Sequence, residues 1–475
     1  MWETTAVPTR ARDSVGMVWR SVCQASARYQ ALVKDLYIRF VNWFEKYVIV
    51  FVLGGFVAGI LGAKVSPSFG NFVDRVIAGF IDGYGFVAPV AIFIILTPAL
   101  ARMFKTRELG SFGIYVIKWY AVRKVLACVW AIAFIALVLR LPITPEGSAS
   151  VWAAMSQSLR SLGSMALTSP YFGAMYASII VALISLRVSV AFRVFDSALS
   201  GIESGGRYFI PVMPIFMVAI GAYIYGLPTN VPEQIGLEAA GGTQILHTLN
   251  IWGWELDPKV STGMIMIYVV GSLLTAIACM MWQFTLLAIT ARKEKRFTIK
   301  GYFRDYWIKV YPLLWSTSSE ALATPLNLYL VKRYSPYVRS SVRRFIVGIG
   351  SYMNINGTLI NVIILGAIVL VMLGFNVSVI ELLLIIPIVF LISYGVPGIP
   401  GELVLFAGPI ALLLNLPAEI TPTFLALYIG LQIGLPDSFR TGSNSTDDQI
   451  AAILMNRVYE DRFLIRQPHV DQEPD

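Results

Sequence analysis

Long apolar segments separated by short polar connectors dominate the chain, and their spacing predicts an all-α protein with eight membrane-spanning helices. The expected spans are residues 47–63, 76–100, 113–141, 171–192, 208–227, 262–290, 345–373 and 421–457. Residues 1–46 are polar and amphipathic, which is typical of a cytoplasmic arm that can lie on a membrane surface. Since this arm has no apolar core close to its start, we expect no cleavable signal peptide.

Two further apolar segments are interrupted, and each predicts a re-entrant helical hairpin. Residues 311–331 enclose the polar run Ser-Thr-Ser-Ser-Glu at 316–320 and have basic flanks on both sides, so this hairpin should enter from inside. Residues 379–414 bend at 394–401 between flanks with few basic residues, so the second hairpin should enter from outside. Interrupted segments in corresponding positions of two half-repeats predict inverted repeats with a binding site between them.

Composition and charge support a polytopic membrane protein. The chain is 57% hydrophobic and only 14% charged, whereas soluble domains carry about 25% charged residues. The net charge of +9 could suggest nucleic acid, but the basic residues lie in connectors such as 102–107 and 292–296, while the loop 228–260 is acidic. This asymmetry indicates inside connectors, cytoplasmic termini and no nucleic-acid partner.

Other function classes have little support in the sequence. Three widely spaced cysteines predict neither a disulfide framework nor a zinc site. We also expect no enzyme, because the chain has only two histidines, both in polar segments, and no motif that sets a nucleophile beside a base.

The candidate chemistry lies in a polar run at residues 435–448, inside the eighth span. On a helix, Asp437, Thr441, Asn444 and Asp448 form one stripe, with Arg440 one turn from Asp437. An ionisable group inside a bilayer costs roughly 2.5–3.5 kcal/mol on the insertion scale, so such groups usually mark a substrate or ion path. The alternatives are a polar loop outside the membrane, or charges that only neutralise one another.

Four ordered motifs over residues 40–460 resemble the dicarboxylate/amino acid:cation symporter family, the glutamate transporter homologues. The run at 316–320 is similar to the serine-rich tip of the first hairpin, although one or two extra residues precede Pro325. Asn-Ile-Asn-Gly-Thr at 354–358 resembles the unwound part of the seventh helix, and 398–401 resembles the second hairpin tip. The stripe from Asp437 to Asp448 fits the eighth-helix spacing without a gap.

The resemblance implies a homotrimer in the cell (inner or plasma) membrane, embedded in lipid and working by an elevator-like motion. Residues 47–112 and 150–259 would form the scaffold and trimerisation domain, and residues 113–149 and 260–460 the transport domain. Residues 461–475 would be a polar tail.

The resemblance also implies a substrate site for a small anion. Arg440 would bind the substrate's side-chain carboxylate and Asp437 its amino group, with the α-carboxylate held by Asn444 and hairpin amides. This favours aspartate or glutamate over a C4 dicarboxylate, which is the alternative substrate class, and a substrate-binding sensor or uncoupled member is a third interpretation. In the empty state, Asp437 and Arg440 could instead pair with each other. The complete implied set is Ser318, Ser319, Thr358, Gly398, Pro400, Gly401, Asp437, Arg440, Thr441 and Asn444.

Coupling to Na⁺, H⁺ or both is implied, with altered cation sites. One sodium site would use Gly350, Asn354, Asn444 and Asp448, and a second would use backbone carbonyls around residues 351 and 395–398. Glu320 is a candidate proton carrier, or else a hydrogen-bond partner of the second hairpin.

The third cation site departs from the family pattern. Asn356 stands where an acid is expected, and Arg123 and Lys124 stand in place of two hydroxyl ligands, a poor combination for Na⁺. Either these side chains form a tethered cation that lowers the number of coupled ions, or they face a lipid or helix surface and extend to the headgroups.

Overall fold

The computed structural model describes residues 47–73, 109–143, 170–188, 246–393, 420–432 and 434–464, together with scattered single residues elsewhere. The predictions for residues 1–34, for the bend at 394–401 and for most of the second and fifth spans therefore lie outside the described residues. The described part is mostly helical, with one short pair of strands, which agrees with the all-α prediction.

Helices match the expected first, third, fourth and sixth spans: α2 (Val48–Val65), α4 (Leu109–Leu139), α6 (Pro170–Ser185) and α9 (Ser261–Lys293). Within the described residues, two helices, at Gly110–Leu139 and Thr262–Lys293, are long and apolar enough to cross a membrane. Both expose large apolar side chains, among them Leu137 on α4 and Leu273 on α9, as lipid-facing helices do.

The first interrupted segment folds as two helices, as predicted. After α10 (Ile299–Gly301) and a π-helical stretch, η3 (Tyr302–Trp307), the chain forms α11 (Ile308–Thr317) and α12 (Glu320–Tyr334). Between them, Ser318 adopts a left-handed conformation with φ of 47°, which ends α11. The serine-rich run is therefore a helix break with short polar side chains, residue types that leave helices readily.

The seventh span is also broken where its sequence predicts, because α13 (Ser340–Met353) and α14 (Asn356–Met372) are separated at residues 354–355. Helix α15 (Val379–Ile392) lies where the first arm of the second hairpin is predicted, and the rest of that hairpin is outside the described residues except for single positions. The eighth span differs from the prediction of one continuous helix. It consists of α17 (Thr421–Gln432) and α18 (Leu435–Tyr459), followed by η4 (Glu460–Leu464), because Gly434 takes a φ of +84° and Pro436 opens the next helix.

A β-hairpin lies in the expected outer loop, and the sequence analysis did not predict it. Strands β1 (Leu249–Ile251) and β2 (Trp254–Leu256) pair antiparallel across a two-residue turn. Both turn residues have positive φ, 52° at Trp252 and 90° at Gly253, as in the tight turns that match the twist of paired strands.

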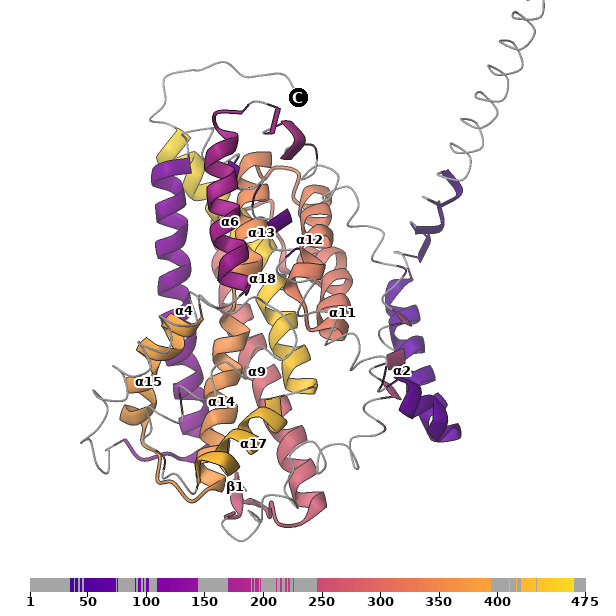
Figure 1. Cartoon of the computed structure of the whole chain (residues 1–475), viewed down its shortest axis with the longest axis vertical. Helices are drawn as coiled ribbons and strands as arrows, with labels where there is room; N and C mark the ends of the chain where they lie inside the picture. The colour runs from indigo at the N-terminus through magenta and orange to yellow at the C-terminus, as the bar shows by residue number, and fades with distance from the viewer. Residues whose placement is uncertain are drawn as a thin grey trace, which may run out of the picture.

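Helix α14 occupies the centre of the described structure, and nearly every residue along it is buried. Figure 1 shows α4, α9, α14 and α18 running alongside one another, and α14 packs against the other three. The pair α11–α12 lies with α13 toward one end, whereas α15, α17 and β1 lie toward the other. One apolar cluster surrounds α14 and a second joins α11, α12 and α13, while α18 carries a polar face between them.

Candidate functional site

Two helix breaks and the side of a third helix meet at the polar middle of the bundle. The break between α11 and α12, the break between α13 and α14, and the side of α18 supply the polar atoms. The first amides of a helix have no intrahelical partner, so the starts of α12 and α14 present N–H groups to this space. Irregular backbone of this kind persists in a membrane protein only where it is buried in protein or lines a cavity.

Arg440 is completely buried, and Asp437 on the preceding turn pairs with its guanidinium. The other terminal nitrogen, Nη1, donates to the Thr358 hydroxyl at 2.8 Å. The alternative considered from the sequence, a mutual i, i+3 salt bridge, is therefore the arrangement present. A substrate that binds Arg440 through a carboxylate must exchange with Asp437.

Asn444 links α18 to both helix starts. Its side-chain oxygen accepts hydrogen bonds from the amides of Gly357 (2.6 Å) and Thr358 (3.2 Å), and its nitrogen donates to Glu320 Oε1 at 2.6 Å. This one side chain therefore joins α18 to the starts of α12 and α14. Glu320 thus accepts a hydrogen bond from α18, and the tip of the second hairpin, its other expected partner, lies outside the described residues.

The remaining predicted substrate residues fall into two groups. Ser318 Oγ lies 3.4 Å from Ser438 Oγ on α18, Ser319 is buried beside the start of α12, and the Thr441 hydroxyl donates to the Asp437 carbonyl at 2.8 Å. Thr441 thus braces its own helix. The other group, on the second hairpin, is outside the described residues: Gly398, Pro400 and Gly401.

Asp448 forms a second polar centre on the same helix. Its carboxylate accepts from Asn354 Nδ2 at 3.0 Å and from Asn327 Nδ2 at 3.2 Å. The carboxylate also lies directly against Gly350, where any Cβ would overlap it. Asn354 Nδ2 donates in addition to the Asn444 carbonyl at 2.6 Å. The sequence analysis missed Asn327, which sits two residues after Pro325 on α12.

The Asp448 carboxylate and the Asn444 backbone carbonyl are oxygen atoms of the kind that a hard cation such as Na⁺ prefers. In this structure these oxygens accept hydrogen bonds from the side-chain amides of Asn354 and Asn327. No three His, Cys, Asp or Glu side chains gather anywhere in the described residues. The Asn444 side chain, by contrast, is engaged with α14 and Glu320, so its backbone oxygen is the part that faces this centre.

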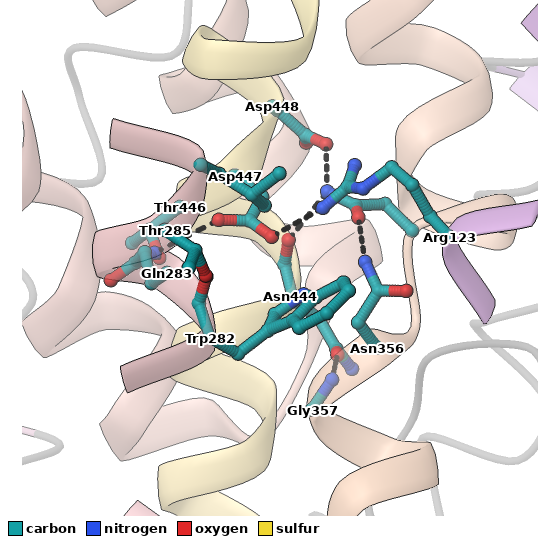
Figure 2. A network of polar contacts seen from close by, with 12 residues as sticks. Arg123, Trp282, Gln283, Thr285, Asn356, Gly357, Asn444, Thr446, Asp447 and Asp448 are labelled. Atoms are coloured by element: carbon teal, nitrogen blue, oxygen red, sulfur yellow. Dashed lines mark hydrogen bonds and ion pairs between the residues drawn. The ribbon is translucent and has the colours of Figure 1, made fainter. Parts of the chain in front are cut away.

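Arg123 points into the bundle and forms a buried ion pair with Asp447 (Figure 2). The distance between Arg123 Nη2 and Asp447 Oδ2 is 2.7 Å, and the two side chains are 5% and 1% exposed. Gln283 Nε2 on α9 donates to the other carboxylate oxygen at 3.2 Å, and the Trp119 ring lies under the guanidinium at 4.5 Å. The sequence analysis did not select Asp447 or Gln283. One residue from Asp448, Asp447 faces a different side of α18, toward α4 and α9.

Lys124 and Asn356 take other directions. Lys124 is completely buried, and its ammonium donates to the Ser393 hydroxyl at 3.0 Å and to the Ser393 carbonyl at 3.3 Å. Asn356 Nδ2 donates to Asn354 Oδ1 at 2.9 Å, while Asn356 Oδ1 has no hydrogen-bond partner among the described residues. Because Arg123 and Lys124 are both buried within the chain, the interpretation in which they extend to lipid headgroups does not fit their positions.

Comparison with known proteins is consistent with this geometry. Residues 260–458 match the model of the sodium:dicarboxylate symporter family. The match extends from α9 through α18 and includes both helix breaks, but it does not include α4, which carries Arg123 and Lys124. No match was found among curated proteins.

Proposed function

We propose that the chain is a symporter of acidic amino acids such as aspartate and glutamate, starting from the match of residues 260–458 to the sodium:dicarboxylate symporter family. The supporting observation is Arg440, a fully buried guanidinium on α18 at the point where the two helix breaks meet that helix. A permanently charged group in such a place is retained where an anion binds.

The pairing of Arg440 with Asp437 favours an amino acid over a C4 dicarboxylate. A bound amino acid brings both a carboxylate for Arg440 and an ammonium for Asp437, so one buried ion pair becomes two. A C4 dicarboxylate would take Arg440 and leave Asp437 as a buried carboxylate without a cation, which is a costly arrangement. The α-carboxylate would lie against Asn444 and the amides at Ser318 and Ser319, where α12 begins.

Cation coupling would involve fewer sodium ions than the family pattern implies. Na⁺ held by Asp448 and backbone oxygens near Gly350 and Asn354 would supply positive charge that stabilises the broken helix beside the substrate. Arg123 would provide a fixed positive charge against Asp447. Glu320, within hydrogen-bond reach of Asn444, would be the group that carries a proton.

The larger assembly follows the same proposal. Three copies would associate through residues 47–112 and 150–259 in the cell membrane, and residues 113–149 with 260–460 would move the bound substrate across. Helix α4 is remote in sequence from α9, α14 and α18, yet it packs against α14, which packs against the other two. This packing supports the assignment of all four helices to one moving body.

Uptake into proteoliposomes tests the function. Radiolabelled L-aspartate should accumulate with an inward sodium gradient, and Arg440→Gln should abolish accumulation. Arg457→Gln is the matched control, since Arg457 lies on the same helix but its side chain is 49% exposed. Equal loss in both variants, or accumulation in Arg440→Gln, would refute the role of Arg440.

Competition and binding distinguish the alternatives. Excess succinate should leave aspartate uptake nearly unchanged. Strong inhibition by succinate would instead indicate a C4-dicarboxylate carrier, and aspartate binding without any accumulation would indicate a sensor or uncoupled protein.

A further inference from the structure

The ammonium of Lys124 sits at the carbonyl end of α15. Lys124 lies midway along α4, whereas Ser393 is the residue that directly follows α15. The ammonium contacts both the hydroxyl and the carbonyl of Ser393, at 3.0 and 3.3 Å. The Ser393 hydroxyl in turn donates to the Phe390 carbonyl in the last turn, so the positive charge is connected to the end of the helix.

A cation at this point has a clear physical role. The last carbonyls of a helix lack intrahelical donors and carry the negative end of the helix dipole. Here Ser393, at that end, is completely buried, so a buried ammonium can serve as the donor to its oxygens. Lys124 is also close enough to Glu320 for electrostatic attraction, so its charge faces an acid on the first hairpin and carbonyl oxygen on the second.

We propose that Lys124 is a built-in cation that fastens the end of α15 to α4, so that the first arm of the second hairpin is held without a dissolved cation. This deepens the proposed function, on which it rests for its consequence in transport. The sequence analysis had grouped Lys124 with Arg123 at one former cation site, but the two side chains bind different elements, Ser393 and Asp447.

Hydrogen–deuterium exchange of the full-length protein without substrate tests the proposal. Wild-type protein should show the same exchange for residues 385–393, the last turns of α15, in sodium chloride and in choline chloride. Lys124→Met should exchange about ten- to one-hundred-fold faster there in choline, the factor expected for losing a hydrogen bond to a charged group. Sodium should restore much of the protection, because Na⁺ can occupy the vacated oxygens.

Two further variants make the result specific. Lys118→Met is the matched control, because Lys118 is an exposed lysine on the same helix, and its exchange pattern should equal that of the wild type. If Lys124→Met does not fold, Ser393→Ala removes one of the two acceptors and keeps the lysine, and it should accelerate exchange several-fold. Unchanged exchange in Lys124→Met or in Ser393→Ala, or acceleration in Lys124→Met that is equal in sodium and choline, would overturn the proposal.

The same variants connect the fastening to transport. Calorimetric binding of L-aspartate to Lys124→Met should depend more steeply on sodium concentration than binding to the wild type, since a dissolved ion now replaces the ammonium. Because the exchange experiment contains no substrate, absence of aspartate binding to the wild type would refute the proposed function and leave the test of Lys124 intact.

Discussion

Arg123→Met should destabilise the protein more than replacing both partners of the Arg123–Asp447 pair. Removing one partner of a buried ion pair usually costs about 3–5 kcal/mol, because it leaves an uncompensated charge, whereas replacing both partners is often close to neutral. After Arg123→Met, Asp447 keeps only the hydrogen bond from Gln283 at 3.2 Å among its described side-chain partners. The free energy of unfolding of Arg123→Met should therefore be lower than that of the wild type by most of this amount.

The converse variant should behave similarly. Asp447→Asn leaves the guanidinium with a neutral acceptor, and neither Arg123 Nε nor Nη1 has a hydrogen-bond partner among the described residues. The stacking of Arg123 over Trp119 remains and offsets part of the loss, by roughly 0.5–2 kcal/mol. The double variant removes both charges and should recover most of the stability.

Thermal unfolding of the purified protein measures this cycle. One kcal/mol shifts the melting temperature of a domain of 150–250 residues by about 2–4 °C, so each single variant should melt several degrees lower and the double variant near the wild type. If the single variants melt with the wild type, or the double variant shows the sum of both losses, the two residues are not energetically coupled.

The same cycle tests whether Arg123 stands in for a cation. Without the guanidinium, the Asp447 carboxylate faces a region that also contains Asn356 and Gln283, each with a side-chain oxygen that has no hydrogen-bond partner among the described residues (Figure 2). Sodium chloride, but not choline chloride, should raise the melting temperature of Arg123→Met, and its uptake should depend more steeply on sodium. An unchanged sodium slope would contradict the tethered-cation hypothesis.

Three further predictions concern other sites. Gly350→Ala would force a Cβ into the Asp448 carboxylate, so it should cost about 1–3 kcal/mol of stability and weaken the sodium dependence of uptake, measured by melting and by transport. Asp437→Asn should lower the affinity for aspartate relative to that for succinate, measured by competition, because the acceptor for the ammonium loses its charge. A hydrogen bond from Arg296 lowers the pKa of Glu294 below its ordinary 4.5, so their pair stabilises the fold above about pH 4.5 and the stabilisation is lost as the pH falls through the lowered pKa. Glu294→Gln should flatten that part of the melting profile, by no more than about 1 kcal/mol for a pair whose arginine is half exposed.

Controls separate these effects from general damage. Gly110→Ala is the control for Gly350→Ala, because a Cβ on Gly110 would meet open space. If both alanine variants behave alike, close approach of Asp448 to the backbone is not the reason for the glycine. If Asp437→Asn leaves the ratio of aspartate to succinate affinity unchanged, Asp437 is a structural partner of Arg440 and does not select the substrate.

The sequence was sufficient for most of the described architecture. The length of the apolar segments predicted α2, α4, α6 and α9, and polar residues within such segments predicted the breaks at Ser318 and at residues 354–355. Both features can be recognised from composition, because a membrane-spanning helix must be apolar along its length and a polar interruption is tolerated only where it is buried. The break at Gly434 was not predicted. A single glycine inside an apolar run is compatible with a continuous helix, and only the packing of α17 and α18 shows that this one takes a positive φ.

The candidate site divides in the same way. Helical spacing alone places Asp437, Arg440, Asn444 and Asp448 on one stripe of α18, and the three charged residues among them, in an apolar span, predict a substrate or ion site there.

Only the tertiary structure shows which other polar residues lie around this stripe and around its neighbour Asp447. Asn327, Gln283 and Asp447 were not selected, since an amide or a second acid has no distinguishing spacing until helices from distant parts of the chain are brought together. For Arg123 and Lys124, the sequence shows two adjacent charges in one helix. Successive residues on a helix point about 100° apart, so packing against different neighbours sends one side chain to Asp447 and the other to Ser393.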